Sequence, residues 1–233
     1  MSEEKEPLTD VPMWDLPTRL FHWCFVIAFA VSWISGKAGY RDLHYSSGMV
    51  LLGLVIFRVL WGLIGSPTAR FAHFLRMPTT AYAYLRRALG HRGPSYSYGH
   101  NAAGGLMVLA LIVLVGLQAL SGMTSTDDVL FDGPLYGRLP SWLDRPLEAL
   151  HRPLGNVLLL LVLLHVLVVV LYRFFKRENL VRAMILGRAR LPRSVAQMAT
   201  QQGVTKSAPV WRALVCAAIA AAVPATIHLT LMT

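Results

Sequence analysis

Five long apolar stretches alternate with polar segments along the chain, at residues 20–36, 44–64, 102–122, 152–172 and 211–232. Each approaches the roughly 20 residues that a helix needs to cross the hydrocarbon core of a bilayer. A helix also satisfies all of its backbone hydrogen bonds within itself, as lipid requires. The pattern therefore predicts an all-α integral membrane protein with five transmembrane helices.

The polar segments divide the chain further. Pro78 is a suitable first residue for a short surface helix over 78–89 that would end near Gly90. Residues 123–150 are punctuated by glycine and proline, as a loop would be, and 187–209 have the composition of a linker. We expect a four-helix part over residues 1–190, followed by a linker and the fifth transmembrane helix over 191–233.

Composition agrees with a membrane protein, because 55% of the residues are hydrophobic and only 15% are charged, whereas soluble domains are nearer a quarter charged. Basic residues gather after the second and fourth apolar stretches, and the loop between the third and fourth is rich in acidic residues. By the positive-inside rule we expect a cytoplasmic N-terminus and a periplasmic C-terminus. The basic charge flanks membrane spans, so no nucleic-acid partner is indicated.

Two further features limit the chemistry. The N-terminus lacks a basic region and no cleavage site follows the first apolar stretch, so we expect a retained helix rather than a cleaved signal peptide. Cys24 and Cys216 form no CxxC or CxxCH motif, which gives no indication of a disulfide framework, a zinc site or a covalently attached c-type haem.

Four histidines fall at two matched depths in the predicted helices. His44 and His151 lie near the outer ends of the second and fourth helices, whereas His22 and His165 lie one to two turns from the inner face. Fourteen residues separate His151 from His165, which places them on one helix face about 21 Å apart along the axis. The fourth helix therefore points two imidazoles in one direction, each level with an imidazole from another helix.

This arrangement predicts two stacked cofactors. Neutral imidazole is a good ligand for iron, and two imidazoles on opposite faces of a planar haem give a six-coordinate iron suited to electron transfer. Helical bundles hold such groups with inward side chains on facing helices. We expect His44 with His151 to bind one haem, and His22 with His165 to bind the other.

Two glycines repeat the same spacing from candidate ligands. Gly48 follows His44 by one turn, and Gly155 follows His151 by one turn. A residue without a side chain would let a macrocycle lie against the helix backbone. The alternative is helix–helix packing, for which small residues are common in membranes.

Cationic side chains near the inner pair are candidates for binding the haem propionates. Arg58 lies fourteen residues after His44, on the same face, and Arg19 lies one turn before His22. The alternative for Arg58 is that its side chain snorkels to the lipid headgroups. His100 has three possible roles: a replacement ligand, a propionate partner, or the lining of a quinone pocket together with Asn101. The remaining histidines, His73, His91 and His228, are expected to be solvated or interfacial.

Five stretches together resemble the bacterial cytochrome b561 and nickel–iron hydrogenase b-type cytochrome family: WDLPTRLFHW, HYSSG, GHNAAGGLMVLALIVLVGLQALSG, DDVLFDGPL and HRPLGNVLLLLVLLH. The similarity covers about residues 12–190. It implies a four-helix membrane bundle with two non-covalent b-type haems, with one ligand in the first helix, one in the second and two in the fourth. On this chain these positions are His22, His44, His151 and His165. The fifth helix lies outside the pattern.

The resemblance also implies a function. Such a protein would relay electrons of a respiratory chain across the bacterial inner membrane, between quinone and a redox partner at the outer face. The partner would be a c-type cytochrome, a hydrogenase-like subunit or a small oxidant or reductant, and the aromatic and acidic loop with DGPLYG is a plausible docking surface. The alternatives are a histidine-lined proton-linked transporter or channel, although the spans contain almost no Asp or Glu to complete a relay, and a membrane anchor whose histidines only pack.

Overall fold

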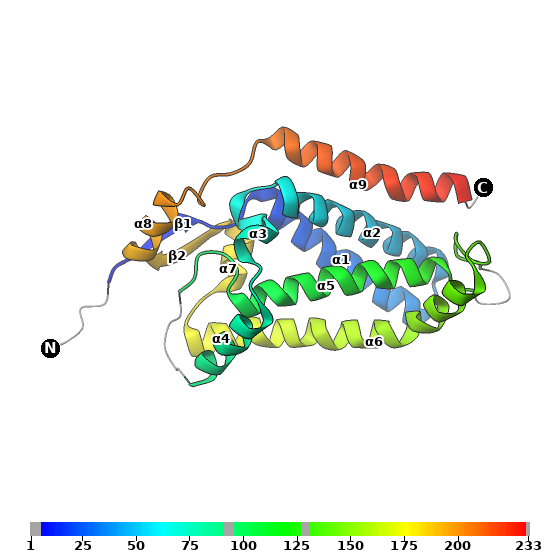
Figure 1. The fold of residues 1–233 in the computed structure, drawn as a ribbon, viewed down its shortest axis with the longest axis horizontal. Helices are drawn as coiled ribbons and strands as arrows, with labels where there is room; N and C mark the ends of the chain where they lie inside the picture. Colours follow the sequence, from blue (N-terminus) through cyan, green and yellow to red (C-terminus); the bar gives the residue numbers. More distant parts are fainter. Residues whose placement is uncertain (1–5, 91–95, 127–130, 232–233) are drawn as a thin grey trace. The chain divides into compact units, whose positions relative to one another are not determined.

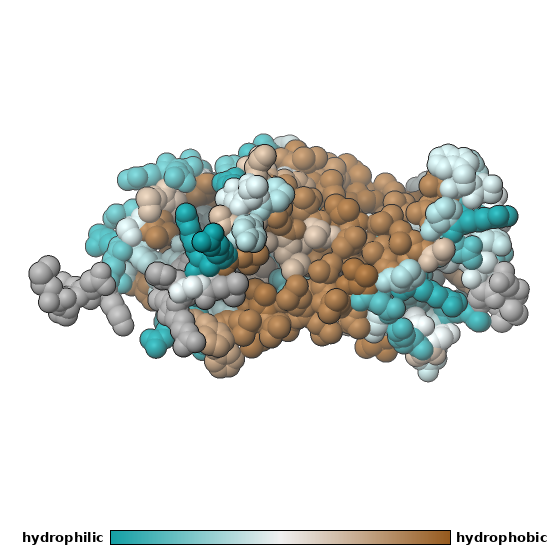
Figure 2. Space-filling model, turned by 60° about the horizontal axis from the view of Figure 1, so that its bottom comes forward, coloured by the Kyte–Doolittle hydropathy of each residue, from teal (hydrophilic) through white to brown (hydrophobic). Residues whose placement is uncertain are grey.

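Five helices dominate the protein, whose computed structural model describes residues 6–90, 96–126 and 131–231. Each is long and apolar enough to cross a membrane, as Figure 1 shows: α1 (Leu16–Ala38), α2 (Arg41–Ile64), α5 (Ala102–Met123), α6 (Ser141–Leu171) and α9 (Val210–Leu231). These helices confirm the five expected spans. Hydrophobic side chains cover much of the surface along them (Figure 2), and Ile27 and Leu160 are exposed on this surface, as lipid-facing residues would be.

Helix α6 begins earlier than the apolar pattern indicated. Residues 141–150, which we expected to belong to a loop, form its first turns. Pro146 and Pro153 lie inside this helix, where each removes a backbone donor without ending the helix. A π-helical turn, η2 (Tyr172–Lys176), follows directly. His151 and His165 therefore stand on one continuous helix.

The chain folds into two compact units, each of which contains parts of several long helices. One, here called the sheet unit, comprises the described residues within 1–20, 61–109 and 164–213; the other, here called the helical unit, comprises those within 21–60, 110–163 and 214–233. His44 and His151 both belong to the helical unit. His22 also belongs to the helical unit, whereas His165 belongs to the sheet unit.

A two-stranded antiparallel sheet gives the sheet unit its name. Strand β1 (Leu8–Pro12) pairs with β2 (Arg188–Pro192), with Leu8 opposite Pro192. Helix α8 (Arg193–Gln201) follows β2, so residues 188–201, expected in a polar linker, form regular structure instead. Buried apolar side chains hold the strands to helices α7 (Leu180–Leu186) and α8: Val11, Met13, Ala183, Leu191 and Ala196.

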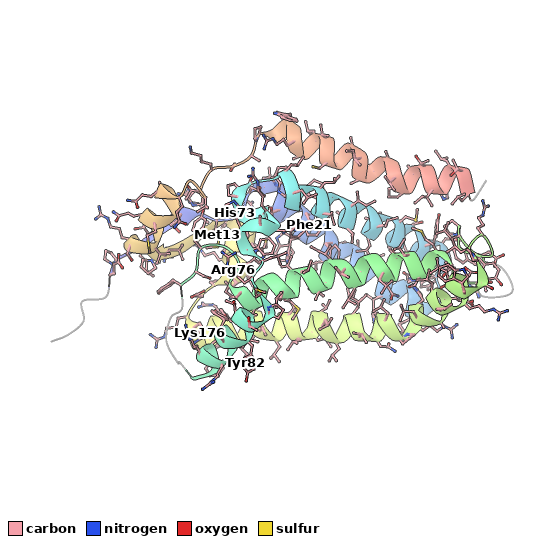
Figure 3. All side chains as sticks on the ribbon, in the orientation of Figure 1. Met13, Phe21, His73, Arg76, Tyr82 and Lys176 are labelled. Carbon is pink, nitrogen blue, oxygen red and sulfur yellow. The ribbon has the colours of Figure 1, made fainter. Side chains whose placement is uncertain are left out.

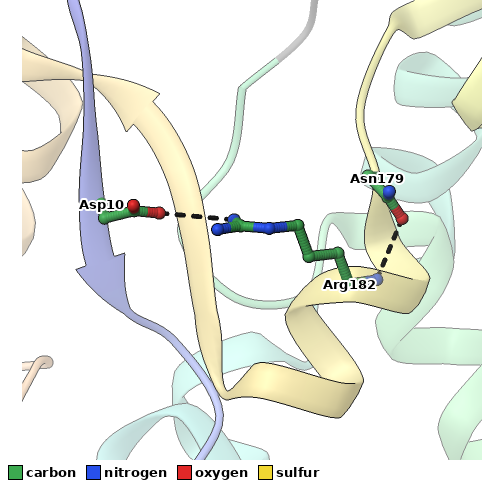
Figure 4. A network of polar contacts seen from close by, with 3 residues as sticks. All are labelled: Asp10, Asn179 and Arg182. Atoms are coloured by element: carbon green, nitrogen blue, oxygen red, sulfur yellow. Dashed lines mark hydrogen bonds and ion pairs between the residues drawn. The ribbon is translucent and has the colours of Figure 1, made fainter.

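Polar contacts fasten the sheet to α7. Arg182 forms an ion pair of 3.3 Å with Asp10 of β1. The backbone N–H of Arg182 donates to the side chain of Asn179 at 2.9 Å, which caps the start of α7. Figure 4 shows both contacts. The N-terminal strand is thus tied to a helix 172 residues away in sequence.

Short helices complete the sheet unit: η1 (Pro67–Ala69), α3 (Phe71–Phe74) and α4 (Pro78–Gly90). Helix α4 confirms the expected surface helix. The ammonium group of the buried Lys176 (Figure 3) donates to the carbonyl oxygen of Ala88 near the end of α4, at 3.1 Å. A cation at the C-terminal end of a helix also interacts favourably with the helix dipole.

Helix α9 packs on α2 within the helical unit. A Cβ atom added to Gly53 would lie 2.8 Å from the carbonyl oxygen of Ala220, so the two backbones are in close contact, as small residues allow in membranes. The hydroxyl of Tyr45 lies 3.2 Å from Nδ1 of His228. His228 is thus engaged with α2 through a tyrosine, and α9 has at least a packing role.

Candidate functional site

The imidazoles of His44 and His151 face each other within the helical unit. Their ring centres are 6.0 Å apart and their planes are inclined by 78°. Metal–imidazole bonds are about 2 Å long, so two imidazoles that bind one metal from opposite sides have ring centres roughly 6 Å apart. The separation of the two rings therefore fits a pair of axial ligands to one iron.

Backbone carbonyls orient both rings. Nδ1 of His44 lies 2.8 Å from the carbonyl oxygen of Ser32 in α1, and Nδ1 of His151 lies 3.2 Å from the carbonyl oxygen of Gln118 in α5. Because a carbonyl oxygen only accepts hydrogen bonds, Nδ1 of each ring carries the hydrogen and Nε2 keeps a lone pair. Metal-binding histidines in proteins are typically held in this way.

Two glycines allow the rings to lie against neighbouring helices. A Cβ atom added to Gly36 of α1 would be 2.8 Å from Nδ1 of His44, and one added to Gly122 of α5 would be 2.8 Å from Cε1 of His151. Both distances are too short for a side chain. The histidines thus come from α2 and α6, whereas α1 and α5 provide carbonyls and bare backbone against which the rings are fixed.

The two glycines chosen from the sequence have different surroundings. A Cβ atom added to Gly48 would meet no described atom within 4 Å, which is compatible with a macrocycle lying against this part of α2. Gly155 instead faces Gln118 and Trp33, which an added Cβ atom would approach to 3.4 and 3.6 Å. The role of both glycines as haem surfaces stays a prediction.

Sequence reasoning missed Gly36, Gly122 and Gln118. Gln118 carried a signal, because it is the one amide or charged side chain among the residues of α5, and polar groups inside membrane spans are costly. The glycines carried none, since their role depends on which helix lies beside which histidine.

Arg19 lies in the sheet unit with its guanidinium group against a backbone turn. A Cβ atom added to Gly187, which has a φ of +76°, would be 2.6 Å from Nη1 of Arg19. The Nε atom of Arg19 is buried and has no hydrogen-bond partner among the described residues. A buried guanidinium donor without an acceptor fits an anionic ligand such as a haem propionate.

Arg58 lies in the helical unit and is only 2% exposed. A snorkelling arginine would place its charged group at the protein surface, so the burial of Arg58 counts against that alternative. An enclosed intramembrane arginine is expected to serve a functional partner. Its role in binding a propionate stays a prediction.

His100 lies in the sheet unit between two aromatic rings, with ring centres 4.6 Å from both Trp14 and Phe74. It lines a cavity of about 320 Å³, together with His73, Arg76 and other residues. Tyr98 also lines this cavity; its hydroxyl donates to the carbonyl of Pro12, and burial raises the pKa of Tyr98 to about 12.

Asn101 is occupied elsewhere, although we expected it in a pocket with His100. Its Oδ1 accepts from the N–H of Gly104 at 2.7 Å, which caps α5, and its Nδ2 donates to the hydroxyl of Tyr172 at 3.1 Å. Among the described residues, His100 borders the cavity and Asn101 does not.

The second expected ligand pair is divided between the two units. The ring of His22 meets Trp23 edge-on, with centres 5.0 Å apart, and His165 is half-buried in α6. Their pairing stays a prediction. His91 lies outside the described residues, and so do Asp127 and Asp128 of the expected docking loop.

Most of the chain matches a known protein family. A family model described as prokaryotic cytochrome b561 matches residues 13–187. The chain belongs to the prokaryotic cytochrome b561 family. Among curated proteins and solved structures, none matches the chain with significance. This family is an all-helical membrane bundle that binds b-type haem and works in membrane electron transfer.

The family match also separates two parts of the chain. The matched residues include α1, α2, α5 and α6, and with them the four candidate ligands. Strands β1 and β2 and helices α8 and α9 lie outside the matched residues. The sheet formed by these two strands therefore lies outside the part that matches the family.

Proposed function

We propose that this protein is a di-haem b-type cytochrome that relays electrons across the bacterial inner membrane, between quinone and a redox partner at the outer face. His44 and His151 would hold one haem, and His22 and His165 the other. The N-terminus would lie in the cytoplasm and the C-terminus in the periplasm. Haem, when bound, supplies one-electron chemistry at iron.

The geometry of the His44–His151 pair carries the proposal. The two rings are 6.0 Å apart, and each directs Nδ1 at a backbone carbonyl. Both Nε2 atoms would then serve as ligands for one iron, with the Gln118 amide nitrogen 3.4 Å from Nε2 of His151. Helix packing alone does not require two histidines with matching hydrogen bonds on neighbouring helices. With His44 and His151 as its protein ligands, the haem iron would transfer electrons rather than bind oxygen.

Other residues would bind and shield the cofactors. Arg19 and Arg58 are suited to neutralise propionates, because both have buried guanidinium atoms. Leucine and valine make up most of α6 between His151 and His165, and they would exclude water from the space between the two haems. His100, which lies between Trp14 and Phe74, would be a further propionate partner.

The quinone and the redox partner are proposed from different observations. The cavity beside His100 falls within the size range of small-molecule sites, which supports a quinone there. Tyr136, in the loop between α5 and α6, and Trp142, in the first turn of α6, are exposed aromatic residues, which are typical of protein-docking surfaces. A c-type cytochrome or a hydrogenase-like subunit would suit this loop, and a small oxidant or reductant would need no docking surface.

The test is the haem content and the spectrum of the purified full chain. Reduced protein should show the α and Soret bands of b-type haem, and mild acid extraction should remove the haem. His151→Ala and His165→Ala should each remove one haem. His228→Ala is the matched control, because His228 also lies in a membrane helix but contacts Tyr45. Absence of haem from the wild-type protein, or full haem content in both ligand variants, would contradict the proposal.

A further inference from the structure

Gln118 stands out in α5 because its contacts converge on His151. Its Nε2 donates to the carbonyl oxygen of His151 at 3.0 Å and lies 3.2 Å from Nδ1 of the ring. The backbone carbonyl oxygen of Gln118 accepts from Nδ1 of His151 at 3.2 Å. One residue therefore touches both the backbone and the ring of a candidate ligand.

The position of Gln118 is unfavourable for the oxygen of its side-chain amide. Oε1 is buried and has no hydrogen-bond partner among the described residues. An unsatisfied buried acceptor destabilises a protein, and a leucine would fill the same position in an apolar helix. Fold stability alone therefore does not account for this glutamine.

Ser121 completes the surroundings of the ring. It is fully buried, and its hydroxyl donates to the carbonyl oxygen of Gln118 at 2.9 Å. The single hydroxyl hydrogen is then used, so Oγ can accept from Nδ1 of His151, which lies 3.0 Å away. The Nδ1 hydrogen of His151 is thus shared between a carbonyl and a hydroxyl.

The partner ring is held differently. The main acceptor for Nδ1 of His44 is the backbone carbonyl oxygen of Ser32, at 2.8 Å, and the Ser32 hydroxyl is farther away, at 3.3 Å. A substitution of Ser32 would leave this backbone carbonyl in place. Side chains therefore contribute more to the support of His151 than to that of His44.

We propose that Gln118 and Ser121 are positioning residues for His151. They fix the rotation of the ring so that Nε2 faces the iron, and Ser121 strengthens the hydrogen bond from Nδ1. The proposal rests on the proposed ligation of a haem by His151. Stronger hydrogen bonding at Nδ1 makes the imidazole a more basic ligand, which favours ferric over ferrous iron and lowers the reduction potential of that haem.

The experiment compares four full-length proteins in detergent: wild type, Gln118→Leu, Ser121→Ala and the control Ser125→Ala. Ser125 lies four residues beyond Ser121, and its hydroxyl donates to the carbonyl of Ser121 rather than to the ring. Transfer of haem to excess apomyoglobin gives the dissociation rate of each haem, and redox titration gives each midpoint potential. The haem that is absent from His151→Ala identifies the affected site.

We expect Gln118→Leu to release this haem roughly ten- to a hundredfold faster, as for other residues that support a metal ligand, while the other haem is released at the wild-type rate. Ser121→Ala should retain both haems and raise the potential of this one alone. Wild-type rates and potentials in both variants, or equal changes at both haems, would overturn the proposal. In that case a wild-type protein with two haems would still support the proposed function.

Discussion

The surroundings of the His44–His151 pair and those of Arg19 and His100 differ in the kind of group they contain. The first set is neutral and hydrogen-bonded: two imidazoles, the glutamine and serine of α5, and the carbonyl of Ser32. The second set combines cations with the aromatic rings of Trp14 and Phe74. Hydrogen bonds and close backbone contacts fix geometry, whereas cations set the local potential. Changes in the first set should therefore alter haem retention, and changes in the second should alter reduction potential.

The largest effect is expected from the glycines that face the ligand rings. Gly36→Ala and Gly122→Ala each place a Cβ atom 2.8 Å from an imidazole atom, so the ring must move away from its carbonyl partner. We expect each variant to lose most of the haem at His44 and His151 and to keep the other. Haem-to-protein ratios measured after purification would show this.

Gly116→Ala is the matched control for Gly122→Ala on the same helix. Its Cβ atom would lie 3.5 Å from Val55, an ordinary contact, and alanine favours helix more than glycine does. This variant should keep both haems. Equal haem content in Gly122→Ala and Gly116→Ala would show that the close contact at the ring does not matter.

A smaller effect, on potential rather than retention, is expected at the cations. Arg19→Leu and Arg58→Leu remove positive charges that favour the reduced, less positive haem. Each should lower the midpoint potential of the haem at His22 and His165 by roughly 60 mV, which corresponds to a factor of ten in the equilibrium constant. Redox titration measures this shift. The control is Arg212→Leu, at a half-buried arginine that donates to the carbonyl oxygen of Ile64 at 3.3 Å, and it should give the wild-type value. If the midpoint potential of the haem at His44 and His151 shifted instead, the assignment of these arginines to the other haem would be wrong.

Asp15 should affect the stability of the sheet unit. Its Oδ1 caps α1 by accepting from the N–H of Thr18 at 2.8 Å, and its Oδ2 accepts from the indole N–H of the buried Trp61 at 3.2 Å. Asp15→Ala should cost about 1–2 kcal/mol of unfolding free energy. Asp15→Asn keeps a good capping side chain and should cost less. Equal denaturation curves for wild type and Asp15→Ala would refute this role.

The smallest effect should appear only at alkaline pH. Burial raises the pKa of Tyr98 from 10 to about 12, so the folded protein favours the neutral phenol. The stability from this group is fully present below pH 10 and is lost as the pH rises towards 12. Between pH 9 and 12, the midpoint temperature of thermal unfolding should therefore fall more steeply with pH for wild type than for Tyr98→Phe. The same pH dependence of the unfolding temperature in both proteins would contradict a raised pKa of Tyr98.

Much of the fold follows from local pattern. The five apolar stretches predict the five long helices, because a single segment in lipid can satisfy its own backbone hydrogen bonds only as a helix. Pro78 and Gly90 placed the ends of α4. The sheet could not be predicted in this way, since β1 pairs with a strand about 180 residues away. The start of α6 was also missed, because its prolines are typical of a loop.

The candidate site divides similarly. Helical spacing and depth selected His44 and His151, and the structure brings their rings together. The groups that hold the rings could not be read from spacing, because Ser32, Gly36 and Gly122 act through their backbones. Gln118 was also missed, although its place as a polar residue in an apolar run gave a signal in the sequence.

The pairing of His44 with His151 on one haem is tested most directly by the haem-to-chain ratio of the double variant His44→Ala/His151→Ala. The wild-type protein should contain two haems per chain, and each single variant should contain one. The double variant should also contain one, because both histidines serve the same haem. A double variant that contains no haem would show that the two histidines bind different haems and would contradict the account.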